Sequence, residues 1–170
     1  MLKEVFYDKK IKIDKDEVES KKLEDVNLAD KDWYAQTEFY GTDEEQNFIS
    51  FIDSFIEKLR QKYSDIALLR NEKFFQVFGF EDGGVFEPDF IMLLKRRNHV
   101  KSIYQIFIEP KGQFLIQHDA WKQKFLLELE SRADTDFKLE NTEFKLIGLP
   151  FYNEQLKREF EEALENKILA

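Results

Sequence analysis

Apolar residues in this chain recur either at helical spacing or in short continuous runs. Thr42 is followed three positions later by Glu45, the pattern of a capping box at a helix N-terminus. The apolar positions that follow recur every three or four residues, which places them on one stripe of a helix. This stripe comprises Phe48, Phe51, Ile52, Phe55, Ile56 and Leu59. We therefore predict a helix with one buried face.

Two later segments have the same helical spacing. Residues 117–132 predict a second helix, with a buried stripe of Trp121, Phe125, Leu126 and Leu129. Asn153 is a suitable N-cap for a last amphipathic helix. The apolar stripe of that helix comprises Leu156, Phe160, Ala163, Leu164 and Ile168.

Short apolar runs between these helices predict strands at residues 66–69, 74–80, 90–94, 103–108 and 144–149. The runs 90–94 and 103–108 are expected to be buried on both faces. Asp82-Gly83-Gly84 predicts a turn, and Pro150 ends the last strand. The order is helix, three or four antiparallel strands, helix, strand, helix, and the strand after the second helix is expected to return parallel to its neighbour. We therefore predict an α/β fold with a central mixed β-sheet flanked by helices.

Residues 1–40 differ from the rest, because Lys, Asp and Glu dominate them. A short alternating piece, Ile11-Lys12-Ile13, and aromatic anchors at Trp33-Tyr34 and Phe39-Tyr40 interrupt the charge. We interpret residues 1–40 as a peripheral arm or linker, with one or two edge strands, that tethers a domain at 41–170 to something upstream. Disorder of residues 8–30 is the alternative.

Composition narrows the class of protein. The 170 residues fit one domain with a sizeable core, and the absence of cysteine excludes disulfides, thiol catalysis and thiolate zinc sites. No signal peptide or membrane-spanning stretch is evident, so we expect a soluble, cytoplasmic protein with no membrane partner. The net charge of −9 counts against a chain that binds nucleic acid tightly on its own.

The strongest candidate site combines Asp89, Glu109 and Lys111. If residues 90–94 and 103–108 form an antiparallel hairpin with its turn near Asn98-His99, Asp89 falls opposite Glu109. Lys111 keeps the same face because side chains alternate along a strand. Two carboxylates and an ammonium at one end of a hairpin can hold a divalent cation and activate a water, which favours a metal-dependent nuclease. A surface salt bridge is the competing explanation.

Further charged residues have two competing interpretations, one as part of the site and one as purely structural. Glu45 can complete the metal site or serve only in the capping box, and Glu44 is the fallback ligand. Lys122 can contact phosphate or remain a solvated helix lysine. For Arg70 and Glu72 we favour an ion pair at the sheet end over DNA contact.

Other charged side chains are expected to stand apart from the site. The basic cluster Lys95-Arg96-Arg97 with Lys101 lies at the hairpin tip, about 25–30 Å from Asp89, so a solvated turn is expected there. His99 and His118 have no metal-ligand partner in the sequence and are expected at the surface.

Six sequence blocks place these residues in a family context. The chain resembles the endonuclease domain at the carboxyl end of the restriction subunit of type III restriction enzymes, in the PD-(D/E)xK nuclease superfamily. The resemblance covers residues 40–152. The blocks are Gly41-Thr42, Leu69-Arg70-Asn71-Glu72, Phe86-Glu87-Pro88-Asp89-Phe90, Ile108-Glu109-Pro110-Lys111-Gly112, Asp119-Ala120-Trp121-Lys122, and Gly148-Leu149-Pro150-Phe151-Tyr152.

The resemblance implies a restriction-endonuclease-like core, in helix-strand-strand-strand-helix-strand order, and Mg²⁺-dependent cleavage of double-stranded DNA. Asp89 and Glu109 would bind the cation, with a main-chain carbonyl near Pro110 as a further ligand, and Lys111 would position the attacking water. It also implies two partners, an ATP-dependent helicase-like motor in the same subunit and a methyltransferase subunit. The chain contains no Walker loop, so we expect it to be the endonuclease domain alone.

Two other functions stay open on the sequence. One is a non-catalytic interaction module, with a nuclease-like fold, that docks a helicase motor to its partner subunit. The other is a hydrolase of the same superfamily that acts on RNA or on a repair intermediate.

Overall fold

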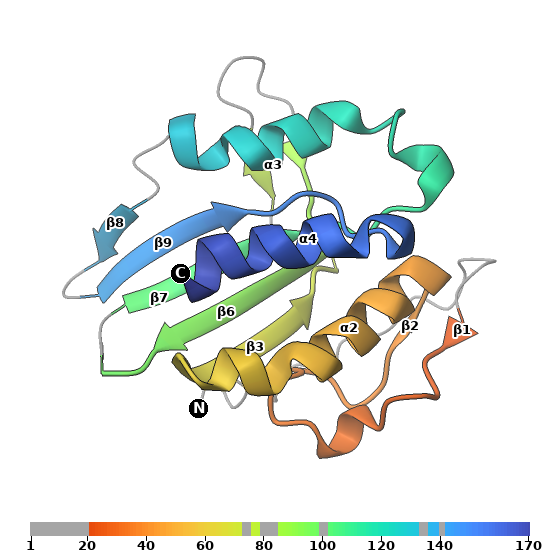
Figure 1. Ribbon diagram of the computed structural model, residues 1–170, viewed down its shortest axis with the longest axis horizontal. Coiled ribbons are helices and arrows are strands. Elements are labelled where there is room, and N and C mark those ends of the chain that lie inside the picture. The colour runs from red at the N-terminus through yellow and green to blue at the C-terminus, as the bar shows by residue number, and fades with distance from the viewer. Residues whose placement is uncertain (1–20, 73–75, 79–84, 99–101, 133–135, 140–141) are drawn as a thin grey trace.

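A computed structural model shows a five-stranded mixed sheet with helices on both faces (Figure 1). The structure describes residues 21–72, 76–78, 85–98, 102–132, 136–139 and 142–170. In spatial order the strands are β3 (Tyr63–Arg70), β6 (Phe90–Arg96), β7 (Ser102–Ile108), β9 (Thr142–Gly148) and β8 (Asp136–Leu139). The principal helices are α2 (Asp43–Arg60), α3 (Ala120–Arg132) and α4 (Lys157–Leu164).

Strand directions agree with the sequence prediction. β3 pairs antiparallel with β6, and β6 pairs antiparallel with β7. β9 follows α3 and pairs parallel with β7, so the predicted parallel return is confirmed. β8 pairs antiparallel with β9. The chain is therefore an α/β protein with a mixed sheet flanked by helices.

α2 begins and packs as its sequence pattern predicts. The Thr42 hydroxyl accepts a hydrogen bond from the backbone N–H of Glu45, and the Glu45 carboxylate accepts one from the backbone N–H of Thr42. This reciprocal capping box satisfies two backbone donors that a helix leaves free. All six residues of the predicted stripe are buried. The stripe fixes α2 against the sheet.

Two hydrophobic cores cover the two faces of the sheet. Alternating residues of β6 and β7 supply each core, because successive strand side chains point to opposite faces. Phe90 and Ile108 pack with α2 and α4, whereas Ile91 and Phe107 pack with Leu126 of α3. Figure 1 shows α2 and α4 side by side on one side of the sheet and α3 apart from them. The central strands are thus buried on both faces, as predicted.

The prediction for the second helix is partly wrong. α3 begins at Ala120, and a 3-10 turn, η2 (Gln113–Leu115), precedes it. Leu126 and Leu129 are buried and Phe125 is half-buried, but Trp121 is 51% exposed. Trp121 lies in the first turn of α3, beside the sheet end at which β6 begins and β7 ends. The helical pattern alone does not reveal where the sheet ends.

Residues 74–80 are predicted as a strand, and part of this segment is described. β4 (Val77–Phe78) pairs antiparallel with β5 (Val85–Phe86) in a small separate sheet. The rest of the segment and the predicted Asp82-Gly83-Gly84 turn lie outside the described residues.

Several apolar residues of the segment 21–41 pack into the main core, whereas most of its charged residues are exposed. β1 (Lys21–Lys22) pairs antiparallel with β2 (Tyr40–Gly41), and a 3-10 turn, η1 (Leu28–Asp30), lies between them. Trp33, Tyr34 and Phe39 are buried, which confirms them as anchors, and Tyr34 forms a parallel bridge with Leu68 of β3. A boundary at residue 41 stays a prediction. Residues 1–20, including Ile11-Lys12-Ile13, lie outside the described part.

The last helical segment starts where the sequence predicts. The Asn153 side chain accepts a hydrogen bond from the backbone N–H of Gln155 and begins the 3-10 turn η3 (Glu154–Leu156), which α4 continues. A π-helical turn, η4 (Glu165–Leu169), follows α4. No helix in the described ranges is long and apolar enough to cross a membrane.

Candidate functional site

The β6–β7 hairpin brings Asp89 and Glu109 together, as the sequence predicts. Phe90 pairs with Ile108 in the antiparallel register, so the preceding and following acids are neighbours. The backbone N–H of Asp89 donates to Oε2 of Glu109 at 3.1 Å. At the other end of the hairpin, Asn98 has a φ of 61°, the left-handed conformation that Asn tolerates in turns. His99 lies outside the described residues.

Glu109 is the most buried member of the site, with 1% of its surface exposed. Its Oε1 accepts hydrogen bonds from two ammonium groups, Lys111 Nζ at 3.0 Å and Lys122 Nζ at 3.1 Å. A buried carboxylate normally requires such partners. Lys111 thus lies beside Glu109, as strand alternation predicts, and Lys122 lies closer to the acids than a solvated helix lysine would.

Asp119 completes this cluster, and the sequence analysis did not select it as a site residue. Its Oδ2 lies 2.9 Å from Lys111 Nζ and 3.8 Å from Lys122 Nζ. Its Oδ1 lies 2.8 Å from Nδ1 of His118, a side chain that is otherwise exposed. The available signal was its position three residues before Lys122 in the Asp119-Ala120-Trp121-Lys122 block.

The surroundings shift the pKa values of Asp89, Lys111 and Asp119, each for a different reason. Burial, reinforced by the nearby carboxylates of Glu109 and Glu45, raises the pKa of Asp89 to about 8. Burial alone would lower the pKa of Lys111, but Glu109 and Asp119 outweigh it and hold that pKa above its ordinary value. Hydrogen bonds from His118 and Lys111 lower the pKa of Asp119 to about 2. Lys111 therefore stays charged at neutral pH, whereas Asp89 keeps its proton until the pH approaches 8.

A backbone bridge fixes the position of the Glu109–Lys111 segment. Tyr152 donates its N–H to the Glu109 carbonyl at 3.1 Å and accepts from the Lys111 N–H at 2.8 Å. The buried Asn153 amide donates to the Lys111 carbonyl at 2.7 Å. These hydrogen bonds hold the segment that carries Glu109 and Lys111 beside residues 152–153.

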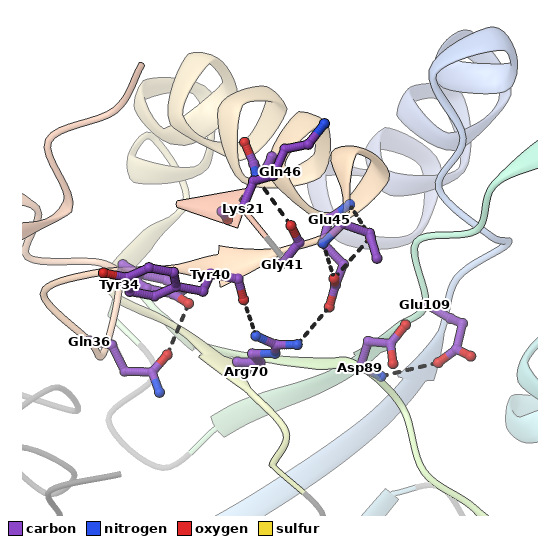
Figure 2. A network of polar contacts seen from close by, with 11 residues as sticks. Lys21, Tyr34, Gln36, Tyr40, Gly41, Glu45, Gln46, Arg70, Asp89 and Glu109 are labelled. Carbon is purple, nitrogen blue, oxygen red and sulfur yellow. Dashed lines mark hydrogen bonds and ion pairs between the residues drawn. The ribbon is translucent and has the colours of Figure 1, made fainter. Parts of the chain in front are cut away.

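Glu45 is the third acid near this point, and Figure 2 shows its carboxylate on the α2 side of Asp89. Its Oε2 accepts from the Thr42 N–H at 2.7 Å and from the Thr42 hydroxyl at 2.9 Å. The capping role is therefore confirmed, and a metal role stays a prediction. The fallback, Glu44, instead accepts weakly from the Glu154 N–H and the Asn153 amide, and burial raises its pKa.

Arg70 joins the site to residues 39–41. Its guanidinium lies 3.3 Å from Oε1 of Glu45 and donates to the Tyr40 carbonyl (Figure 2). It also lies over the Phe39 ring, 5.1 Å from the ring centroid. An ion pair at the sheet end is thus present, and its acid here is Glu45, which is distant from Arg70 in the sequence; a pair of Arg70 with Glu72 stays a prediction. No local pattern identifies that partner.

The basic hairpin tip faces away from the acids. Arg97 donates from Nε to the Arg60 carbonyl at 2.9 Å, and Lys95 lies 4.0 Å from Asp65. Lys101 lies outside the described residues. Over the described part of the chain, no three His, Cys, Asp or Glu side chains are grouped closely enough to enclose a metal ion by themselves.

Comparisons with known proteins place the chain in one family. The HI_1054_C family, described as a C-terminal domain, matches residues 1–168. An uncharacterized protein of Haemophilus influenzae (strain ATCC 51907 / DSM 11121 / KW20 / Rd) is 40% identical over 155 residues. That match covers 83% of this chain but 34% of the relative, so the chain spans about a third of the relative's length. No solved structure matches. Because the family match covers nearly all of the sequence, the chain belongs to the HI_1054_C family.

Proposed function

We propose that this chain is the metal-dependent DNA endonuclease domain of a type III restriction enzyme, with a restriction-endonuclease-like core. The observation that carries the proposal is the meeting of Asp89 and Glu109 across the β6–β7 hairpin, with Lys111 on the same side. Acids and a lysine in this arrangement suit hydrolysis of a phosphodiester bond. The six sequence blocks that resemble type III restriction subunits support the choice of DNA as substrate.

The donor set fits a divalent cation such as Mg²⁺. Asp89 and Glu109 supply hard carboxylate oxygens, and a main-chain carbonyl near Pro110 is a further candidate ligand. Burial, and secondarily the carboxylates of Glu109 and Glu45, raise the pKa of Asp89, and a bound cation would relieve both effects. These groups would hold the ion, with Glu45 as a further ligand. When bound, the ion would supply a water of lowered pKa and stabilise negative charge on the phosphate.

The lysines have donor roles in this proposal. Lys111 is held between Glu109 and Asp119, and its raised pKa keeps it an ammonium group at neutral pH. It therefore orients the attacking water or neutralises a phosphate oxygen, and it does not act as a general base. Lys122 shares Oε1 of Glu109 and is the nearest further cation for the phosphate backbone.

The proposed partners follow from charge and from the resemblance. A net charge of −9 gives this chain little attraction for DNA. A helicase-like ATPase part of the same parent subunit and a methyltransferase subunit would therefore bind and deliver the DNA. The greater length of the Haemophilus relative, and the description of the family as a C-terminal domain, are compatible with such additional parts.

The proposal is tested first in the complete enzyme. Asp89→Ala, Glu109→Ala and Lys111→Ala should each abolish DNA cleavage while ATP hydrolysis continues. Cleavage that persists in the Asp89 and Glu109 variants would reject the assigned site.

Calorimetry on this chain provides a second test that needs no activity. Mg²⁺ should bind the natural chain, and Asp89→Asn should remove that binding. Asp65→Asn is the matched control, because Asp65 lies on β3 beside Lys95, at the opposite end of the sheet.

The competing function is a non-catalytic interaction module that docks the motor to its partner subunit. The ion pairs of Glu109 with Lys111 and Lys122 favour it, since they neutralise the buried acid without a metal. This alternative predicts no Asp89-dependent heat with Mg²⁺ or Mn²⁺. It also predicts that Asp89→Ala leaves DNA cleavage by the complete enzyme intact.

A further inference from the structure

Asp119 occupies the position of a helix cap, but its carboxylate contacts other side chains. It directly precedes α3, and its carbonyl accepts from the N–H groups of Lys122 at 2.9 Å and Gln123 at 3.5 Å. An aspartate at this position usually accepts a backbone N–H of the first turn through its side chain. In the described part of the chain, the carboxylate contacts are instead with the side chains of Lys111, Lys122 and His118. Helix capping therefore does not account for this acid.

Hydrogen bonds of the preceding loop hold Asp119 in place. The Leu115 N–H donates to the Gly112 carbonyl, and the Asp119 N–H donates to the Leu115 carbonyl, both at 2.9 Å. Oδ2 of Asp119 lies 2.9 Å from Lys111 Nζ, and each of these two side chains is only 14% exposed. Water and salt screen an ion pair of this burial less than a pair at the surface. The Asp119 carboxylate is therefore a fixed counter-charge for Lys111.

Two acids and two lysines form a closed ring of charge beside the site. Oε1 of Glu109 lies 3.0 Å from Lys111 Nζ and 3.1 Å from Lys122 Nζ. Oδ2 of Asp119 lies 2.9 Å and 3.8 Å from the same two ammonium groups. Each lysine thus has one partner acid directly after β7 and one directly before α3. The four formal charges of the ring cancel.

The two acids of this ring differ in their relation to the proposed metal ligands. Glu109 faces Asp89, whose backbone N–H donates to its Oε2. A divalent cation held by these two acids would place positive charge beside both ammonium groups, because both contact Glu109. Like charges at such short distances repel each other strongly in a partly buried site. Asp119 is not among the proposed ligands, so its negative charge stays with the lysines.

We propose that Asp119 is a positioning residue that keeps the Lys111 ammonium group at the site when a divalent cation occupies Glu109. This inference rests on the proposed function and adds a residue to it. Asp119 acts through Lys111, which orients the attacking water or neutralises a phosphate oxygen. Without the cation, Glu109 is sufficient to hold Lys111. The role of Asp119 is therefore specific to the metal-bound chain.

The direct test is NMR of the full chain with carbon-13 at the ε-methylene groups of lysine. The order parameter of the Lys111 signal measures how firmly that side chain is held, and Lys111→Arg identifies the signal. In EDTA, Lys111 should be ordered in both the natural chain and Asp119→Asn, a variant that keeps the shape of the side chain but not its charge. With saturating Mg²⁺, the order should persist in the natural chain and fall in Asp119→Asn.

Glu130→Gln is the matched control for this experiment. Glu130 also lies on α3 and pairs with Lys167 at 2.8 Å, so the variant loses the same charge from the same helix without contacting Lys111. Its Lys111 signal should match that of the natural chain in both conditions.

Calorimetry separates a positioning residue from a metal ligand. Mg²⁺ should bind Asp119→Asn with an affinity within about tenfold of the natural chain, because Asp119 is not a ligand. Asp89→Asn should abolish the same binding.

Kinetics of the complete enzyme provide a further readout. Asp119→Asn should lower kcat for DNA cleavage about 10- to 100-fold, because a displaced catalytic group costs rate. The KM for DNA and the rate of ATP hydrolysis should stay unchanged. Asp119→Glu retains the charge and should recover part of the lost kcat.

Four results would overturn the inference. They are an equally ordered Lys111 in the Mg²⁺-bound natural chain and Asp119→Asn, an equal loss of order in EDTA and in Mg²⁺, loss of Mg²⁺ binding in Asp119→Asn, or an unchanged kcat in that variant. Failure of the proposed function looks different, because Asp89→Asn would then leave Mg²⁺ binding intact or Lys111→Ala would still cut DNA. If both of those variants lose function while Asp119→Asn behaves like the natural chain, only the role of Asp119 is wrong.

Discussion

The backbone N–H of Asp89 holds the carboxylate of Glu109 at 3.1 Å. Two acids 20 positions apart are thus joined by the main chain of one and the side chain of the other. A substitution at Asp89 changes the side chain but retains this backbone donor. Asp89 variants therefore test the charge of the site more than its architecture.

The first prediction concerns stability and pH in the absence of metal. Burial and the neighbouring acids raise the pKa of Asp89 from 3.8 to about 8, so the folded chain retains a proton that the unfolded chain releases. This stabilisation is complete below pH 3.8 and is lost as the pH rises toward 8. Asp89→Asn does not titrate, so its advantage in unfolding free energy should grow over that window by about a few kcal/mol.

Urea denaturation in EDTA, at several pH values, measures this difference. Addition of Mg²⁺ at pH 8 should stabilise the natural chain and leave Asp89→Asn unchanged. If the unfolding free energies of the two proteins change with pH in parallel, the pKa of Asp89 is not raised in the folded chain.

The second prediction concerns Gly41, which precedes the helix cap. A Cβ at this position would lie 2.7 Å from Oε2 of Glu45 and still closer to the Phe39 ring. Gly41→Ala should therefore displace the capping box and lower the unfolding free energy by about 1–3 kcal/mol. Gly112→Ala is the control, because the nearest atom to its Cβ would be Glu44 Cγ at 4.0 Å. Thermal denaturation of both variants measures their stability. Equal losses of stability in the two variants would contradict the steric explanation.

A third prediction separates the two roles of Glu45. A glutamine can keep the capping box but loses the ion pair with Arg70, whereas an alanine loses both, so Glu45→Ala should lower the unfolding free energy by about 0.5–2 kcal/mol more than Glu45→Gln does. If Glu45 is also a metal ligand, Glu45→Gln should weaken Mg²⁺ binding at least about tenfold in calorimetry. The matched variant is Glu44→Gln, because Glu44 contacts the Asn153–Glu154 turn. Equal Mg²⁺ affinities for the two glutamine variants would leave Glu45 as a cap alone.

The fourth prediction compares two lysines of α3. Lys122→Met keeps the apolar stem but removes one of the two ammonium groups on buried Glu109, so the unfolding free energy should fall by about 1–3 kcal/mol. Lys124 is exposed and lies 3.7 Å from Glu128, so Lys124→Met should change stability by less than about 0.5 kcal/mol. Chemical denaturation measures both. If Lys122→Met leaves the unfolding free energy unchanged, Lys111 alone is sufficient to neutralise the buried Glu109 carboxylate.

Local patterns were sufficient for much of the fold. The capping box at Thr42 and the apolar stripe of α2 depend on residues within a few turns, and both are confirmed. The hairpin register follows from symmetry about its turn, which correctly placed Asp89 beside Glu109. The prediction that Trp121 is buried was wrong. Burial depends on where the sheet ends, and helical spacing carries no information about that.

The rest of the site depends on contacts between distant segments. Arg70 pairs with Glu45 across β3 and α2, and Asp119 meets Lys111 only because α3 starts at the end of the sheet. In residues 21–41, the charge pattern did not reveal which side chains are buried. Their many charges suggested an exposed arm, but the few aromatic residues among them, Trp33, Tyr34 and Phe39, are the ones that pack.

The packing of that segment determines how the domain should be isolated. A shortened chain that starts at Thr42 would retain every proposed ligand and lysine. It would nevertheless lose the Phe39 ring beneath Arg70 and the Tyr40 carbonyl that Arg70 binds. It would also expose core atoms that Trp33 and Tyr34 cover. The smallest unit in which the site can be measured therefore extends at least as far back as Trp33, well before α2.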